Sequence, residues 1–146
     1  MRGAESPAEV AAAFRIRHEV FVIEQRLFEE SDHDARDDDP DTVHLIALVD
    51  GDIVGTVRLY RLDDQGTWLG DRLAVSRAHR VLQLGASLVD LAVATAGRLG
   101  GTVMHAHIQL PNVLFFQRLG WVPSGPTEVY CGTAHQPMSI DLKGSR

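Results

Sequence analysis

The hydrophobic positions of the chain follow a helical spacing in some segments and a strand-like pattern in others. In residues 9–28, one face of a helix would carry Val10, Phe14, Arg17, Phe21 and Glu24, which recur every three or four residues. This spacing predicts a helix over residues 9–28, with Ser6-Pro7 as its cap and first turn.

Short apolar runs separated by turn residues predict the strands. The runs at 44–49 and 53–61 flank Asp50-Gly51, a pair typical of a tight hairpin. A second turn at 63–66 leads into a third strand at 68–75.

The helical spacing returns after residue 84, in a stripe formed by Leu84, Leu88, Leu91, Thr95 and Leu99. The predicted helix begins at Gly85 and ends at Gly100-Gly101. It is followed by a strand at 103–108, a short helix at 112–119 and closing strands at 129–131 and 138–142. This order predicts one mixed α/β (α+β) domain over residues 1–146.

Composition narrows the functional classes. The 146 residues carry 20 acidic and 14 basic side chains, so the net charge of −6 makes nucleic acid an unfavourable partner. No apolar run is long enough to cross a membrane, and the N-terminus lacks the apolar core of a signal peptide. The single cysteine, Cys131, excludes an internal disulfide and favours the reducing cytoplasm, where we expect an inert, partly buried thiol.

Nearly all of the negative charge lies in residues 29–41, which hold eight acidic residues and one arginine. The segment lacks the glycine and the final glutamate of a calcium-binding EF-hand loop, so no metal site is predicted. We interpret the segment as a solvated loop. The alternative is a lip of the acceptor site that attracts cationic substrates.

The segment 73–87 is the one most suggestive of chemistry. A strand ends, a basic turn follows and a helix begins, so unpaired backbone N–H groups and the helix dipole point to one place. Arg72, Arg77 and Arg80 add positive charge around this turn. The pattern is typical of a pyrophosphate site, although an ordinary surface turn has the same local sequence features.

Four blocks of the chain together resemble the GCN5-related N-acetyltransferase (GNAT) superfamily, and in particular its ElaA-type subgroup. They are the segments 17–25 (RHEVFVIEQ), 80–85 (RVLQLG), 112–121 (NVLFFQRLGW) and 135–138 (HQPM). The family signature has Arg or Gln, two residues, Gly, one residue, and Gly or Ala. Arg80 and Gly85 match its ends, whereas Gln83 stands where the first glycine is usual.

The resemblance implies a mostly antiparallel twisted sheet flanked by helices, with a V-shaped splay between the two central strands. It also implies acetyl-CoA as co-substrate. The strand backbone at Leu73, Ala74 and Val75 would bind pantetheine, and the N–H groups from Leu82 to Ser87 would bind the pyrophosphate. The full set implied to bind the cofactor is Leu73, Ala74, Val75, Arg80, Gln83, Leu84, Gly85, Ala86, Ser87, Asn112, Phe115 and Phe116.

The catalytic groups are less clear, because Phe116 occupies the position at which many members of the family have a tyrosine acid. Tyr130 is a replacement candidate. Asp71 and His107 are candidates for the base that an ammonium acceptor requires. The residues expected to contact the acceptor are Glu24, His44, His105 and His135.

Each of these assignments has a structural alternative. For Asp71 the alternative is an ion pair with Arg58 or Arg72, and for His105 and His107 it is a place along a half-buried strand. For Glu24 the alternative is a solvated helix end.

The function implied by the resemblance is transfer of acetyl from acetyl-CoA to a small-molecule amine by direct attack. The main alternative is a CoA-binding regulatory domain without turnover, which Gln83 and Phe116 both favour. An acyl-homoserine lactone synthase shares the fold but is considerably longer. By resemblance, residues 129–142 are a candidate homodimer edge.

Overall fold

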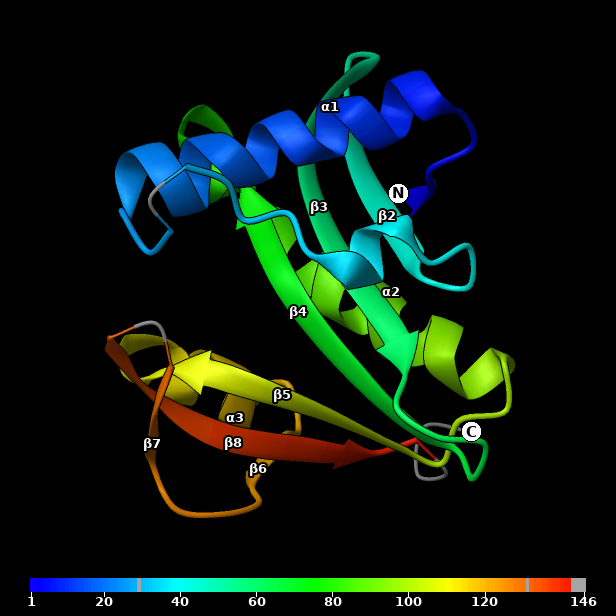
Figure 1. The fold of residues 1–146 in the computed structure, drawn as a ribbon, viewed down its shortest axis with the longest axis vertical. Helices are drawn as coiled ribbons and strands as arrows, with labels where there is room; N and C mark the ends of the chain where they lie inside the picture. The colour runs from blue at the N-terminus through cyan, green and yellow to red at the C-terminus, as the bar shows by residue number, and fades with distance from the viewer. Residues whose placement is uncertain (29, 131, 143–146) are drawn as a thin grey trace.

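A computed structural model describes residues 1–28, 30–130 and 132–142, without the side chains of Val81, Leu82 and Tyr130. In this part of the chain, eight strands form one sheet in the order β1-β2-β3-β4-β5-β8-β6, with β7 also paired to β8 (Figure 1). The strands are β1 Arg2–Gly3, β2 Val43–Val49, β3 Asp52–Arg61, β4 Thr67–Val75, β5 Val103–Gln109, β6 Val122–Pro123, β7 Glu128–Tyr130 and β8 Thr133–Asp141. All pairs are antiparallel except β4 with β5, which confirms the predicted mostly antiparallel sheet.

The two central strands separate after a short contact. Only three residue pairs join β4 to β5, and the last is Leu69 with His105. Beyond this point β4 continues to Val75 and β5 to Gln109, and Figure 1 shows the two strands diverging. The V-shaped splay implied by the family resemblance is therefore confirmed.

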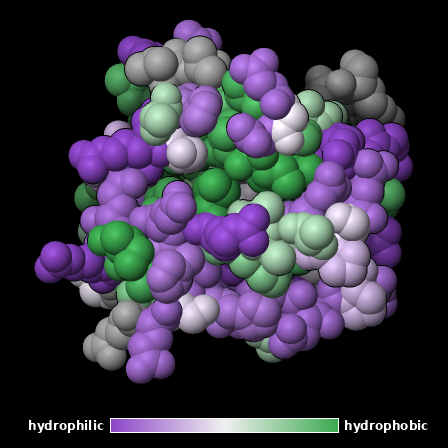
Figure 2. Space-filling model, turned by 90° about the horizontal axis from the view of Figure 1, so that it is seen from above, coloured by the Kyte–Doolittle hydropathy of each residue, from purple (hydrophilic) through white to green (hydrophobic). Residues whose placement is uncertain are grey.

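Helices cover both faces of the sheet. Helix α1 (Pro7–Arg17) and its π-helical continuation η1 (His18–Glu24) lie across one face of β2–β4, and α2 (Leu84–Arg98) lies on the other (Figure 1). Successive side chains of β3 point to opposite faces of the sheet, and those of Val57 and Leu59 pack in the core under α2. On the face seen from above, hydrophobic residues gather near the middle, and hydrophilic residues surround most of them (Figure 2).

The first helix begins as predicted but ends earlier. The Ser6 hydroxyl accepts a hydrogen bond from the Glu9 N–H, and Pro7 occupies the first turn. The prediction of helix through residue 28 is wrong, because η1 ends at Glu24 and Arg26 adopts a left-handed conformation with φ of 53°. The chain then turns back, and the Leu27 N–H donates to the Phe21 carbonyl.

The other predicted elements are confirmed with small changes at their ends. Asp50 and Gly51 both have positive φ, as a tight hairpin turn requires. The third predicted helix corresponds to α3 (Val113–Arg118), whereas the closing strand β8 begins at Thr133, five residues earlier than predicted. Cys131, for which we expected an inert thiol and the end of the strand at 129–131, lies outside the described residues. The pattern missed β1, β6 and the 3-10 turns η2 (Ala35–Asp38), η3 (Arg77–Leu82) and η4 (Leu110–Asn112).

No helix in the described ranges is both long and apolar enough to cross a membrane.

Candidate active site

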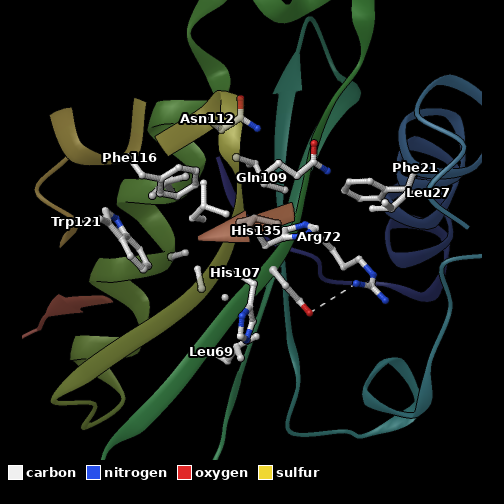
Figure 3. Close-up of a pocket in the computed structure, with 18 of the residues that line it drawn as sticks. Phe21, Leu27, Leu69, Arg72, His107, Gln109, Asn112, Phe116, Trp121 and His135 are labelled. Atoms are coloured by element: carbon white, nitrogen blue, oxygen red, sulfur yellow. Dashed lines mark ion pairs between the residues drawn. The ribbon is translucent and has the colours of Figure 1, made fainter. Parts of the chain in front are cut away.

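A cavity of about 550 Å³ opens where β4 and β5 separate. It extends from the segment after η1 through the splay to α3 and β7 (Figure 3). The residues that line this cleft include Phe21, Gln25, Phe28, Tyr60, Leu69, Asp71, Arg72, Leu73, His107, Gln109, Asn112, Phe116, Trp121, Glu128 and His135.

A bulge in β4 sets the direction of the backbone at the cleft. The register with β3 shifts between Thr56 and Arg58, and opposite this shift Arg72 has a φ of 55°. Further along, the Ser76 N–H donates to the Val54 carbonyl of β3 at 2.7 Å. Because N–H groups alternate along a strand, those of Leu73 and Val75 point away from β3, into the splay.

The turn after β4 leads directly into α2. Its last residue, Gln83, has φ 56° and ψ 27° and gives the helix no side-chain cap. Among the described residues, no side chain accepts a hydrogen bond from the N–H groups in the first turn of α2, and this arrangement suits an anion. The left-handed backbone at Gln83 also explains why glycine is favoured at this position.

Arg80 and Glu24 pair with each other. The Arg80 guanidinium donates to both carboxylate oxygens of Glu24, with Nη2 at 2.7 Å from Oε1, and its Nε donates to the Val75 carbonyl. The hydrogen bonds from Arg80 lower the pKa of Glu24. Arg80 was expected to bind the cofactor and Glu24 the acceptor, but the two side chains neutralise each other. Arg77, on the same turn, is exposed.

Part of the acidic segment is buried and not solvated. Asp32 is buried, and the Asp37 side chain has no exposed surface. Buried Arg17 donates to Asp32 at 2.6 Å and to both oxygens of Asp37 at 2.7 and 2.8 Å. The prediction of a solvated loop is therefore wrong for Asp32 and Asp37, whereas Asp38, Asp39 and Asp41 are exposed. A local pattern of charges could not reveal that buried arginines on other elements would pair with part of the segment.

The same network continues towards the cleft through Arg58 of β3. Its guanidinium binds Asp34 at 2.6 Å and, through Nε and Nη2, both oxygens of Asp71 at 2.7 and 2.6 Å. Burial opposes the ionisation of Asp37, but hydrogen bonds from Arg17 and from the Asp34 N–H outweigh burial and hold its pKa well below the usual range. In the described part of the chain, no group of three or more potential ligands is arranged to hold a metal ion.

Arg72 belongs to this network and not to the turn between β4 and α2. Its guanidinium donates to the Asp32 carbonyl at 3.1 Å and lies over the Phe28 ring. The expectation that Arg72 adds positive charge at that turn is wrong, since the bulge in β4 directs its side chain towards the acidic segment. Asp71 lies 3.9 Å from Arg72 and pairs with Arg58, so its ion-pair interpretation is confirmed.

Three of the four histidines singled out from the sequence face the cleft side of the sheet. His107 lines the cleft, with Nδ1 at 2.7 Å from Glu128, and His105 lies on the same face of β5. His135 is buried and lines the cleft, and its Nδ1 lies 2.8 Å from the Thr133 carbonyl. His44 lies instead beneath α1, edge-on to Phe14, where burial lowers its pKa.

Aromatic side chains form the wall of the cleft beside α3. Phe116 is buried and meets Phe115 and Trp121 edge-on at centroid distances of 5.3 and 5.5 Å. Figure 3 shows Phe116 and Trp121 side by side on this wall. The buried Trp121 Nε1 has no hydrogen-bond partner among the described residues, so it is a donor that a ligand oxygen can use. Asn112 lines the same wall. The Tyr130 side chain lies outside what the structure describes.

Sequence reasoning missed two residues that join the sides of the cleft. Glu128 reaches His107 from β7, and Gln109 at the end of β5 donates to Gln25 at 3.0 Å. Both contacts join residues brought together only by the sheet, and no local pattern marks either residue.

The comparisons with known proteins agree with this geometry. Residues 10–121 match the acetyltransferase (GNAT) family. An acyl-CoA N-acyltransferase from Pseudomonas aeruginosa is 28% identical, with a TM-score of 0.82 over 93% of this chain and 92% of that one. Escherichia coli ElaA is 24% identical, with a TM-score of 0.83 over the same shares. BjaI, a CoA-dependent acyl-homoserine lactone synthase, is 24% identical, with a TM-score of 0.79 over 93% of this chain and 77% of that one.

The family match and the similar structures assign the chain to the acyl-CoA-dependent N-acyltransferases. The chain belongs to the GNAT acetyltransferase family, and its fold is shared with ElaA.

Proposed function

We propose that this protein transfers an acetyl group from acetyl-CoA to the primary amine of a small molecule, by direct attack in a ternary complex. The observation that carries the proposal is the pair of backbone N–H groups at Leu73 and Val75 that face the open splay. Pantetheine would lie there like an added strand, and an N–H at this edge would polarise the thioester carbonyl.

The start of α2 would hold the pyrophosphate. The first-turn N–H groups at Leu84, Gly85 and Ala86 have no side-chain cap, and the positive end of the helix dipole favours an anion there. A methyl group built on Gly85 would meet nothing closer than 3.9 Å, so the backbone beside this site is open. Asn112, Phe115 and Phe116 would flank the thioester end.

His107 is the stronger of the two candidates for the base. Asp71 is already bound through both oxygens to Arg58, which makes it a poor proton acceptor. Phe116 has no proton to give, so water would protonate the departing thiolate.

The acceptor would enter between the segment after η1 and β7. Phe21 and Phe28 provide apolar surface there, and Glu128 carries negative charge suited to an ammonium group.

Acetyl-CoA binding and turnover test the proposal separately. At 100 times its Kd, acetyl-CoA should stabilise the protein by about 2.7 kcal/mol, which raises the melting temperature. Thiol release should then appear with at least one of spermidine, kanamycin, lysine and phenethylamine. No thermal shift at millimolar acetyl-CoA would exclude the proposal. A shift without thiol release would favour the regulatory alternative, which Phe116 in place of a tyrosine supports.

Two substitutions of one residue supply a control for the binding site. Ser87 is exposed in the first turn of α2, so Ser87→Asp adds a negative charge where the pyrophosphate would lie. We expect it to weaken acetyl-CoA binding at least tenfold, whereas the neutral Ser87→Asn should stay within about twofold. Equal affinities for the two variants would place the phosphates elsewhere.

We also propose a cytoplasmic location, on the basis of the single cysteine, and a homodimer formed through residues 129–142. Analytical ultracentrifugation at micromolar concentration tests the dimer, and a purely monomeric protein would exclude it.

A further inference from the structure

The most informative contact outside the cofactor side of the cleft joins His107 of β5 to Glu128 of β7. The His107 Nδ1 lies 2.7 Å from Glu128 Oε1, and each side chain is about half exposed, at 46% and 50%. Figure 3 shows the His107 ring in the splay, where the cleft opens. Since both residues also line the cleft, the contact belongs to its wall.

The sheet holds this pair in place. His107 is opposite Pro137 of β8, and Glu128 is opposite His135 on the other edge of the same strand. Residues directly opposite each other in a sheet share a face, and so do alternate residues of one strand. His107 and Glu128 therefore lie on one face and meet across β8, and their contact is set by strand register.

The contact also determines which nitrogen of His107 is free. An ionised carboxylate has no proton to donate, so the Nδ1 that meets Glu128 carries the hydrogen. In the neutral imidazole this leaves Nε2 unprotonated, as a base requires. Asp71 on the facing edge of β4 is two residues beyond the last β4–β5 pair, as His107 is on β5, but Arg58 holds it.

We infer that Glu128 is a positioning residue for the transfer reaction, which holds His107 as the Nδ1–H tautomer with Nε2 ready to accept a proton from the acceptor ammonium. This inference rests on the proposed function. His107 Nε2 takes one proton from R–NH₃⁺, the nitrogen lone pair forms the C–N bond, and the C–S bond breaks. The CoA thiolate takes one proton and the other passes to solvent, so the products are the amide, CoA–SH and H⁺. The negative charge of Glu128 stabilises the imidazolium between these steps.

Kinetics of matched variants test the role of Glu128. The acceptor probe is whichever of spermidine, kanamycin, lysine and phenethylamine wild type acetylates fastest. Glu128→Gln should lower kcat by about 10- to 100-fold, with the KM for acetyl-CoA unchanged within twofold. In a His107→Ala background the same change should have almost no further effect. Glu19→Gln removes an exposed charge outside the cleft and serves as control.

The tautomer of His107 gives a readout that does not need turnover. Long-range ¹H–¹⁵N NMR spectra should show the Nδ1–H tautomer in wild type and a mixture in Glu128→Gln, because an amide group no longer dictates which nitrogen carries the proton. An unchanged kcat, additive effects of the two substitutions, or an Nδ1–H tautomer retained in Glu128→Gln would each overturn the inference. If wild type acetylates none of the four amines, the proposed function fails, and the NMR comparison still decides whether Glu128 sets the tautomer.

Discussion

Glu24 and Arg80, 56 residues apart in the chain, form a bidentate ion pair beside the turn that joins β4 to α2. The pair links the end of η1 to this turn, and Arg80 also donates a hydrogen bond to the Val75 carbonyl at the splayed edge. Under the proposed function, Glu24 would compete with a phosphate of acetyl-CoA for the same guanidinium.

We therefore expect Glu24→Gln to strengthen acetyl-CoA binding by about two- to fivefold, because an exposed ion pair is worth only up to about 1 kcal/mol. Isothermal titration calorimetry measures the change, and Glu19→Gln controls for the loss of one negative charge. Weaker binding in Glu24→Gln would mean that the pair pre-orients Arg80 for the cofactor instead of occupying it.

The buried network of the acidic segment should contribute strongly to stability. Asp37→Asn leaves Arg17 buried with an incomplete set of acceptors, so we expect the free energy of unfolding to fall by about 3 kcal/mol. The neighbouring Asp38 has a side chain that is 76% exposed, and Asp38→Asn should change stability by less than about 0.5 kcal/mol. Urea unfolding of both variants makes the comparison. Similar losses would show that the segment is held by something other than the Arg17–Asp37 pair.

The same network should make stability depend on acid. Asp34 and Asp37 both have a lowered pKa in the folded protein, so the unfolded chain binds more protons as the pH falls. Their contribution is fully present above the unfolded pKa of about 3.9 and is lost progressively below it. Melting temperatures between pH 6 and pH 3 should fall less steeply in Asp37→Asn than in wild type. Parallel curves would show that Asp37 does not carry this dependence.

The left-handed backbone at Gln83 should be strained. A residue with a side chain is destabilised by roughly 1–2 kcal/mol in this conformation, and glycine avoids that cost. Part of the stability gained by glycine is lost again, because glycine has more conformational freedom in the unfolded chain. We expect Gln83→Gly to raise the melting temperature by about 1–3 °C. Gln83→Ala keeps the strain and shortens the side chain, so it should not be stabilising. An equal gain in both variants would assign the effect to the glutamine side chain and not to the backbone.

Much of the fold could be predicted from local patterns. The hairpin at Asp50-Gly51 needs two residues with positive φ, and the cap at Ser6 needs a hydroxyl before the first turn, so short-range chemistry marks both. The end of the first helix could not be placed, because residues 25–28 keep the apolar spacing while the chain leaves the helix to pack beside the cleft.

The candidate site also has a part that could be predicted from local sequence and a part that could not. The turn between β4 and α2 and the splayed strand are contiguous in sequence, so a family signature of six residues was sufficient to mark this turn as the candidate cofactor site, and the glycine-favouring conformation of Gln83 agrees with that signature. The roles of Asp71, Glu24 and Arg72 depend on arginines and carboxylates from other elements. Each could be judged only once its partner was known.

The amino-acid sequence alone was enough to define the family, the order of the main elements and the turn that we propose binds the cofactor, because backbone geometry over a few residues determines these features. The three-dimensional arrangement determines which charges remain free. It buries Arg17 and Arg58 against the acidic segment and brings Glu128 to His107 across β8. Ion pairs form between whichever groups the packed sheet and helices bring together, and that proximity is not a property of any single segment.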